Sequence, residues 1–209
     1  DHSEQFDSRA YDINDKGIAV GHVNTFVNGN LRTKFYHVDT NFPAGDMELI
    51  IPNDFFEGSS STARAINENG FIVGEGEVET HNSSSKPRRT HAFLYDIAND
   101  KFTNLNDFLS CDSAYTIIEA RDINDINEIS ATAIVKVPRR DSKGELMVDA
   151  DGTQLVEDVV RSVTLKPIDG EVEDCSKVVE TVEREGASFG LWTLGLIGLL
   201  GFRRKRTAD

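Results

Sequence analysis

Apolar and polar residues alternate in short runs separated by turn residues, and one such pattern occurs three times. The copies occupy residues 10–21 (AYDINDKGIAVG), 63–74 (ARAINENGFIVG) and 120–131 (ARDINDINEISA). The Ile-Asn pair starts at positions 13, 66 and 123, so successive copies lie 53 and 57 residues apart. A repeat of this length is one supersecondary unit that must stack on its neighbours to bury its apolar faces.

Each copy has the composition of a β-hairpin turn. Asn at the first turn position can accept hydrogen bonds from the backbone that follows it, and the fourth position suits a residue that tolerates positive φ. Gly and Asn are the residues that tolerate it best. The predicted turn residues at these two positions are Asn14, Gly17, Asn67, Gly70, Asn124 and Asn127. The small residues Gly21, Gly74 and Ala131 that close the copies indicate a close backbone approach.

A second hairpin is expected in each unit. In the middle unit its strands are residues 91–96 and 102–105, and in the first unit 34–39 and 47–51. In the third unit, residues 161–165 fit a third strand, and no fourth strand is evident. Four short strands in about fifty residues predict an all-β fold of antiparallel units that form part of a β-propeller. A stacked β-solenoid is the alternative.

The predicted organisation is a β-repeat domain over residues 1–175, a charged linker over 176–186 and a membrane segment with a basic end over 187–206. The repeat units would cover about residues 9–58, 59–110 and 111–175.

The tripeptide His91-Ala92-Phe93 and the Asp-Ile-Asn-x-x-Gly-x-x-Val-Gly pattern together resemble the extracellular HAF-repeat proteins over about residues 9–165. The resemblance implies an exported protein of Gram-negative bacteria with a β-rich repeat domain, and it implies no known activity.

The net charge of −14 is unevenly distributed. Residues 203–209 hold four basic residues and one acid, which leaves 18 basic and 35 acidic side chains, a net charge of −17, in the first 202 residues. Such a surface repels nucleic acid, and we expect no nucleic-acid partner. The chain starts at Asp1 without a signal peptide, and three units are few for a propeller, so a missing N-terminal part is expected.

Two cysteines, Cys111 and Cys175, bracket the third unit and are predicted to form a disulfide, with two free buried thiols as the alternative. Within the same unit, residues 139–158 form an insertion. Its Asp149, Asp151 and Glu157 could be calcium ligands, but a hairpin with an Asp-Gly turn explains the same residues. Residues 80–90 are polar and predict a mobile surface loop.

The C-terminal region contains 17 uncharged residues, 186–202, which as a helix would span roughly 25 Å, at the short end for crossing a bilayer. The basic cluster that follows predicts a cytoplasmic C-terminus, with the repeats outside the cytoplasm. This membrane-orienting cluster consists of Arg203, Arg204, Lys205 and Arg206.

The tail also resembles bacterial C-terminal sorting signals of the GlyGly type, with Gly186-Ala187-Ser188 where that family usually has two glycines before serine. The resemblance implies cleavage by a rhomboid-type protease at the inner membrane, followed by transfer to the cell surface or release. The membrane and this protease are the expected partners.

The sequence contains no HExxH motif, P-loop, paired zinc ligands or dinucleotide fingerprint, so no catalytic residue, metal or cofactor is predicted. Asp12 and Asp122 resemble a carboxylate pair, but the middle copy has Ala65 at that position. His37 and His91 lie at strand positions that favour structural roles. We expect a non-enzymatic binding, adhesion or structural protein of the cell envelope, whose ligand the sequence does not identify. The alternative is a carbohydrate- or ester-acting propeller enzyme with part of its site in a missing N-terminal region.

Overall fold

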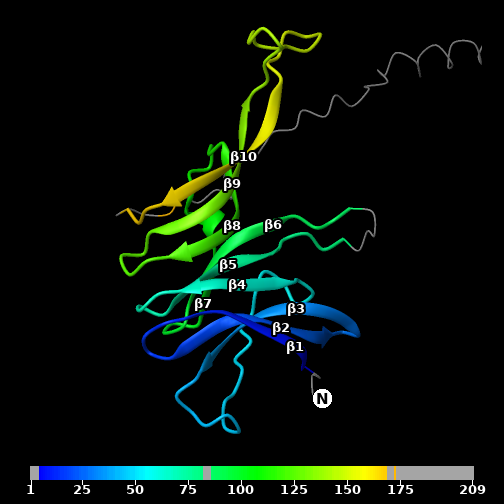
Figure 1. The fold of residues 1–209 in the computed structure, drawn as a ribbon. Helices are drawn as coiled ribbons and strands as arrows, with labels where there is room; N and C mark the ends of the chain where they lie inside the picture. The colour runs from blue at the N-terminus through cyan, green and yellow to red at the C-terminus, as the bar shows by residue number, and fades with distance from the viewer. Residues whose placement is uncertain (1–4, 82–85, 169–171, 173–209) are drawn as a thin grey trace, which may run out of the picture. The chain divides into compact units, whose positions relative to one another are not determined.

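The computed structural model describes residues 5–81, 86–168 and 172, which build three antiparallel sheets (Figure 1). The chain divides into residues 1–175 and 176–209, and all described residues belong to the first of these units. The first sheet comprises β1 (Gln5–Ile13), β2 (Ile18–Val27) and β3 (Asn30–Asp39). The second comprises β4 (Ser61–Ile66), β5 (Phe71–Glu77), β6 (Thr90–Asp96) and β7 (Lys101–Asn104), followed by the short 3₁₀ helix η1 (Leu105–Phe108). The third comprises β8 (Tyr115–Ile123), β9 (Ile129–Pro138) and β10 (Val156–Leu165).

Each sheet is a meander in which sequential strands are hydrogen-bonded neighbours. The prediction of an all-β fold of antiparallel units is confirmed. A β-solenoid would pair strands from successive units in parallel, whereas every strand pair in the described residues is antiparallel and lies within one unit. The solenoid alternative is therefore wrong.

The three repeated turns join the first two strands of each sheet and have the same geometry. In the middle copy, Gly70 N–H donates to Asn67 O at 3.1 Å and Asn67 N–H donates to Phe71 O at 3.1 Å. The fourth turn residues, Gly17, Gly70 and Asn127, have φ of 78°, 83° and 64°. The side-chain Oδ1 of each first Asn accepts the N–H of the residue that follows the fourth turn position. Local turn chemistry thus sets how the first two strands of each sheet pair next to the turn.

A β-bulge interrupts the first strand of each sheet at the same repeat position. The pairing shifts between Ala10 and Asp12 in β1, and equivalent shifts occur in β4 and β8. The bulged residues are Tyr11, Arg64 and Arg121. A bulge redirects the side chain of the extra residue. The three units therefore present these three side chains at equivalent positions.

The glycines opposite these strands permit a close backbone approach. A Cβ atom at Gly21 would lie 1.8 Å from Arg9 O, and one at Gly74 would lie 2.0 Å from Thr62 O. Ala131 occupies the equivalent position in the third unit and is buried. The first two sheets therefore require glycine at a position where the third sheet accepts a methyl group.

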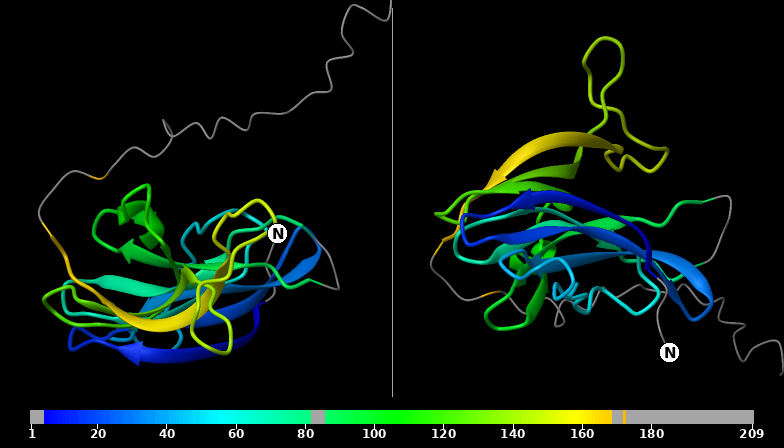
Figure 2. Two further views of the ribbon diagram at one scale, coloured as in Figure 1. Left: turned by 90° about the horizontal axis from the view of Figure 1, so that it is seen from above. Right: turned by 60° about the horizontal axis from the view of Figure 1, so that its bottom comes forward.

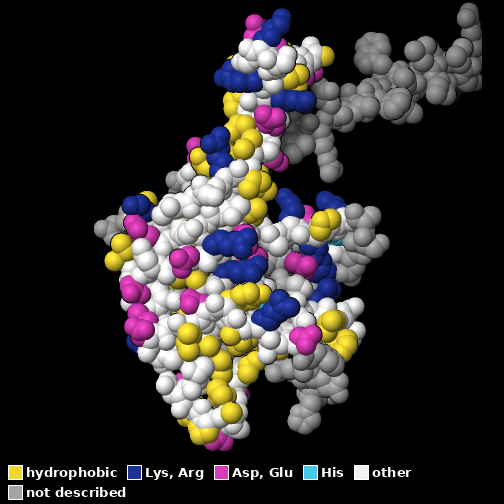
Figure 3. Space-filling view, viewed as in Figure 1, with side chains coloured by type: hydrophobic (Ala, Val, Ile, Leu, Met, Phe, Trp, Pro, Cys, Tyr) yellow, Lys and Arg dark blue, Asp and Glu magenta, His cyan; other side chains and the backbone are white. Residues whose placement is uncertain are grey.

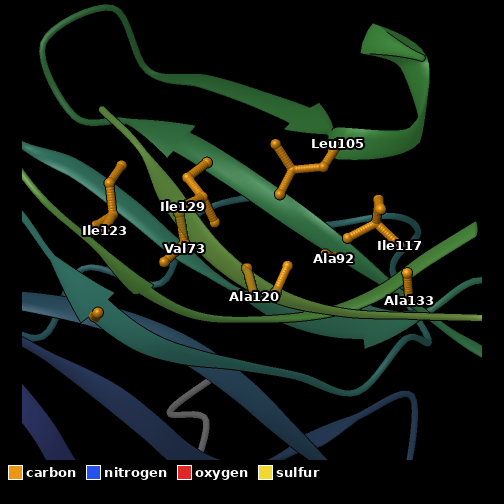
Figure 4. Packing of buried hydrophobic residues seen from close by; sticks show 10 residues of the cluster. Val73, Ala92, Leu105, Ile117, Ala120, Ile123, Ile129 and Ala133 are labelled. Carbon is orange, nitrogen blue, oxygen red and sulfur yellow. The ribbon is translucent and has the colours of Figure 1, made fainter. Parts of the chain in front are cut away.

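In Figure 1 the sheets lie one over another in chain order, with the first at the bottom and the third at the top, and Figure 2 shows the same stack from two further directions. The core between the first and second sheets is aromatic: the ring centroids of Phe35 and Phe93 are 4.7 Å apart, and those of Phe93 and Phe102 are 5.0 Å apart. The core between the second and third sheets is aliphatic and contains Val73, Ala92, Ile117, Ile129 and other small side chains (Figure 4). Both cores draw residues from adjacent units, as expected for repeats that bury their faces against each other.

The outer face of the third sheet is mixed in polarity. Ser130 and Ser162 lie at the positions that Val20 and Phe35 occupy on the buried face of the first sheet. Both serines are exposed, as is Thr164 beside them. The same face also carries Val160, which is 65% exposed and pairs with Ile134, so the described stack ends on hydroxyl groups next to an apolar pair.

The structure differs from the expected strand count in the first unit. In the first unit, residues 47–51 contribute a single bridge, His37 to Ile50, rather than a fourth strand. Met47, Leu49 and Ile51 instead cover the apolar outer face of that sheet. The third sheet has three strands in the described residues. The hairpin between β2 and β3, made by Asn28 and Gly29 with φ of 52° and 76°, was not predicted although Asn-Gly is a strong hairpin signal.

The insertion in the third unit contains two turns of the same type as the repeat. Gly144 N–H donates to Asp141 O, and Gly152 N–H donates to Asp149 O. Asp149 Oδ1 accepts the N–H groups of Asp151 and Thr153, so this carboxylate stabilises a turn. The hairpin interpretation describes this segment, and no group of metal-ligating side chains occurs among the described residues.

Several sequence predictions fall outside the described residues. These include the linker 176–186, the membrane segment 187–206, the motif Gly186-Ala187-Ser188 and the basic cluster 203–206. Cys175 lies there too, so its disulfide with Cys111 remains a prediction. Among the residues that the structure does describe, there is no helix of the length and apolarity needed to cross a bilayer.

Candidate functional site

The repeated turns contact one another in a ladder that joins all three units. Asn14 Nδ2 donates to Asn67 O at 3.1 Å, and Asn67 Nδ2 donates to Asn124 O at 3.0 Å. Asn127 Oδ1 also accepts from Asn67 Nδ2 at 2.8 Å, a contact that glycine could not make. The asparagines therefore act both within a turn and between turns, which explains their spacing of 53 and 57 residues.

The carboxylate of Asp12 also joins two units. Its Oδ1 accepts the N–H of Ile13 and its Oδ2 accepts the N–H of Ile66, each at 2.9 Å. Asp122 accepts the N–H of Ile123 in its own unit. The structure thus does not bring Asp12 and Asp122 together as a carboxylate pair. In the middle unit, Ala65 has no carboxylate to offer to the Ile66 amide. Asp12 of the first unit supplies that acceptor instead.

A row of charged side chains crosses the first strands of the sheets at the bulge positions. Arg64 Nε lies 3.0 Å from both carboxylate oxygens of Glu75, and Arg64 Nη2 lies 3.7 Å from Glu119 Oε1. Arg121 Nη2 pairs with Glu119 Oε2 at 2.8 Å. The Arg64 guanidinium also lies 5.2 Å from the centre of the Tyr11 ring. Figure 3 shows basic and acidic side chains gathered over this part of the stack.

The row is a structural ion-pair network more than a reactive site. Burial raises the pKa of Glu75, while its hydrogen bonds to Arg64 act in the opposite direction. Glu75 and Glu119 both converge on Arg64, and each therefore has a cationic partner. Arg64 contacts Tyr11 in the unit before it and Glu119 in the unit after it, so it helps to hold β1, β4 and β8 in position relative to one another.

The three residues of the His-Ala-Phe motif all have packing roles. Ala92 faces the third sheet in the aliphatic core, and Phe93 lies in the aromatic core on the opposite side of the strand. His91 Nδ1 lies 3.1 Å from Asn104 Nδ2, and burial lowers the pKa of His91. The motif therefore marks a strand that is buried on both faces.

The Arg88 side chain is an anchor rather than part of a solvated loop. It is only 9% exposed and pairs with Glu77 Oε2 at 2.6 Å. Arg88 Nη1 also donates to Gly58 O at 3.0 Å. The prediction of a mobile loop over residues 80–90 is therefore wrong for this end of the segment.

A cavity of about 300 Å³ opens between the outer end of the β2–β3 hairpin and the segment that leads to β4. Its apolar walls include Phe26, Val27, Ile51, Pro52 and Phe56. Its polar residues are Thr25, Lys34, Asn53, Asp54 and Glu57. The lining thus has as many polar as apolar residues, and a cavity with convergent polar groups is a candidate site for a small ligand.

The floor of this cavity is a buried ion pair. Lys34 Nζ lies 3.0 and 2.9 Å from the two carboxylate oxygens of Asp54, and the two side chains are 8% and 2% exposed. Ser61 Oγ donates to Asp54 Oδ2 at 2.7 Å and accepts the N–H of Phe35. The floor thus links both sheets. Thr25 lines the same cavity, and its buried Oγ1 has no hydrogen-bond partner.

The rim of the cavity is held in place by neighbouring residues. Asn28 Nδ2, from the β2–β3 turn, donates to Glu57 Oε1 at 3.1 Å. The Arg88 guanidinium lies 5.7 Å from the centre of the Phe56 ring. Phe26 and Asn53 at the opening are exposed. A ligand would therefore meet an arrangement that is already formed, which lowers the entropic cost of binding.

Buried histidines should make the stack sensitive to acid. Burial lowers the pKa of His37, with Asp100 partly opposing the shift, and burial also lowers the pKa of His22. A folded-state pKa below the unfolded value near 6.5 means that the unfolded chain binds more protons. The free energy of unfolding should therefore fall as pH drops below about 6.5, by up to about 1.4 kcal/mol per pH unit for the buried His37.

The test is urea unfolding of the wild type and of His37→Leu at pH 7 and 5.5. Leucine is the residue at the equivalent position, Leu94, in the middle unit. We expect the variant to lose less stability between the two pH values than the wild type. An equal loss in both proteins would show that His37 does not contribute.

The structure places the predicted turn residues Asn14, Asn67 and Asn124 in one contiguous ladder. It brings none of the predicted site residues into the cavity. The residues of the cavity and of the charged row were missed because they lack a local motif. The available signal was the recurrence of a bulky residue, Tyr11, Arg64 or Arg121, at one repeat position.

Comparisons with known proteins identify the family of the chain but no activity. No curated protein matches the chain. No solved structure matches it either. The model of the family described as "Protein of unknown function (DUF3466)" matches residues 1–205, and the chain therefore belongs to this DUF3466 family.

Proposed function

We propose that the three sheets are consecutive blades of propeller-type packing, with β1, β4 and β8 as the inner strands. The support is that each sheet is a meander beginning at the strand that carries the repeat turn, and that adjacent sheets pack face to face. A neighbour on the outer face of the third sheet would meet hydroxyl groups at Ser130 and Ser162 and the exposed apolar side chain of Val160.

The function that this arrangement supports best is non-enzymatic binding by an exported, HAF-like β-repeat protein of the cell envelope. The observation that carries the proposal is the cavity over the Lys34–Asp54 ion pair, because it is preformed and is lined by apolar and polar residues in equal number. The charged groups form ion pairs: Arg64 pairs with Glu75 in the charged row, and Lys34 pairs with Asp54 in the cavity. Such pairs suit a rigid scaffold more than acid–base chemistry.

The proposed route to the envelope depends on the tail. Residues 187–206 would form a membrane helix oriented by Arg203–206, with the repeats outside the cytoplasm. The Gly186-Ala187-Ser188 motif would act as a GlyGly-type sorting signal, cut by a rhomboid-type protease before surface display or release. The acidic repeat surface keeps such an exported domain soluble.

Protease shaving of intact cells, with mass spectrometry of the released and retained peptides, tests this proposal. We expect peptides from the repeat units to be released from outside, and the mature C-terminus to lie near Ala187 or Ser188. Gly186→Leu should block that cut. Repeat peptides that remain protected in the cytoplasm would contradict export. An intact C-terminus at Asp209 would contradict the sorting signal and leave a single-span anchor.

A further inference from the structure

We infer that two copies of this chain pair head to tail, with β1 of each copy docked on the outer face of the third sheet of the other. The inference rests on the proposed propeller-type packing and goes beyond the proposed binding function. Within the chain, β4 contacts all three strands of the first sheet, and β8 contacts β4, β5 and β6 of the second. The first strand of one sheet thus lies across the sheet before it. β1 has no sheet before it in the part of the chain that the structure describes.

The side chains of β1 that would make this contact are exposed, whereas their equivalents are buried. Ile13 is 55% exposed, but Ile66 and Ile123 at the same repeat position are 5% and 6% exposed. Ala10 is likewise exposed, whereas the alanines at its position in the other two units are fully buried. In those units the preceding sheet covers both positions. β1 therefore has the same apolar residues as β4 and β8 but lacks the sheet that covers them.

The ladder of turns leaves complementary groups unmatched at its two ends. Asp15 N–H donates to Glu68 Oε1 at 2.6 Å, and Glu68 N–H donates to Asp125 Oδ1 at 3.0 Å. Among the described residues, the Asp125 N–H has no acceptor and the Asp15 carboxylate has no donor. A second copy placed as the next unit would bring its Asp15 carboxylate to this N–H and continue the series.

The asparagines of the ladder leave a second complementary pair. Asn67 O accepts two hydrogen bonds, one from its own turn and one from Asn14 Nδ2. Asn14 O accepts only the bond from its own turn in the described residues. Asn124 Nδ2 uses one of its two hydrogens on Glu128 Oε2, at 3.2 Å. Its second hydrogen would meet Asn14 O of the other copy, as in the two equivalent contacts within the chain.

The outer face of the third sheet is the surface that would receive β1. Ser162 occupies the position of Phe35 in the first sheet and of Ala92 in the second. Both of those residues pack in the same core as the isoleucine of the following unit. Ser162 should therefore face Ile13 of the other copy. Because a hydroxyl replaces an apolar side chain here, we expect a weaker and reversible contact than those within the chain.

Two copies suffice to close the assembly. A contact between different surfaces of identical chains generates a ring when its rotation closes. Figure 1 shows β1 and the third sheet at opposite ends of the stack, so each copy can make both contacts. Two chains together supply twice the three sheets of one, or six. This number lies within the four to eight blades of propellers, whereas three chains would exceed it.

Sedimentation velocity of the full chain in a zwitterionic detergent, over about 1–500 μM, tests the inference. We expect the protein mass to double with rising concentration and to grow no further. Ile13→Glu and Ser162→Arg each put a charge on one docking surface, and each should weaken pairing at least about tenfold because the charge would be buried. The matched control, Val148→Glu, changes an equally exposed apolar residue in the insertion and should pair as the wild type does. Urea unfolding of each variant verifies the fold.

Mixing the two variants gives a result that only head-to-tail pairing produces. The Ile13→Glu chain keeps an intact third sheet, and the Ser162→Arg chain keeps an intact β1. A mixed pair therefore regains one native contact and sets the two introduced charges, opposite in sign, against each other at the second. We expect the mixture to pair where neither variant pairs alone.

Four results would overturn the inference. A monomer at every concentration would do so, as would pairing that both variants retain or a mixture that fails to recover pairing. A mass that keeps growing with concentration would show open chains of copies instead of a closed pair. Each of these results would leave the protease-shaving result, and so the export proposal, intact.

Discussion

Gly74→Ala should destabilise the protein by about 3 kcal/mol, the upper range for forcing an extra methyl group into a packed core. A Cβ atom at this position would lie 2.0 Å from Thr62 O and 3.0 Å from the Cα of Ala63. These are backbone atoms of β4, so relief requires the whole strand to shift. Such a shift would disturb the bulge at Arg64 and the contacts that β4 makes with both neighbouring units. Chemical denaturation followed by circular dichroism gives the free energy of unfolding.

Two substitutions serve as controls for this prediction. Gly45→Ala introduces the same methyl group where nothing lies within 4 Å, and it should be neutral or slightly stabilising. Ala131→Gly changes the equivalent position of the third unit in the opposite direction, and it should cost only about 1–2 kcal/mol for the lost buried methyl group and the freer backbone. Unchanged stability of Gly74→Ala would show that β4 and β5 are not as close as described.

Asn67→Ala should cost about 3 kcal/mol, because it leaves several buried polar groups without partners. Asn67 is 3% exposed. Its Oδ1 accepts the N–H groups of Asn69 and Phe71, and its Nδ2 donates to Asn124 O. The substitution therefore opens the middle turn and disconnects it from the third unit. Denaturation curves report the loss.

Asn124→Ala is the matched control, since the same turn residue at the end of the ladder is exposed and donates to no further unit in the described residues. We expect a loss of about 1 kcal/mol or less. Equal losses for Asn67→Ala and Asn124→Ala would mean that the turns act locally and that their contacts between units contribute nothing.

The turns, the inner hairpins and the all-β class were predictable because they depend on local chemistry. Asn at one position and Gly or Asn three residues later specify the hairpin wherever they occur, and the insertion repeats the same solution with Asp141 and Asp149. The Asn28-Gly29 hairpin is equally local, because Asn and Gly adopt the positive φ angles that its turn requires.

The candidate site was not predictable because it depends on how units stack. Asp12 looks like an imperfectly repeated carboxylate until the structure shows it accepting the Ile66 amide, 54 residues away. Arg64 likewise joins Tyr11 and Glu119 across two unit boundaries. The cavity forms only because residues 51–57 fold onto the β2–β3 hairpin. The first sheet has three strands instead of the expected four for a similar reason. Residues 47–51 cover its apolar face and do not add a fourth strand to its edge.

The central claim is that the repeat turns hold the three units in one stack, and hydrogen exchange at the Ile66 amide tests it most directly. The Asn67 N–H points to β5, so the preceding Ile66 N–H points away from its own sheet and relies on Asp12 of the first unit. We predict slow exchange in the wild type and much faster exchange in Asp12→Ala, while the Ile123 amide, bonded to Asp122 of its own unit, stays protected. Fast exchange of Ile66 in the wild type, or protection unchanged by Asp12→Ala, would contradict the stack.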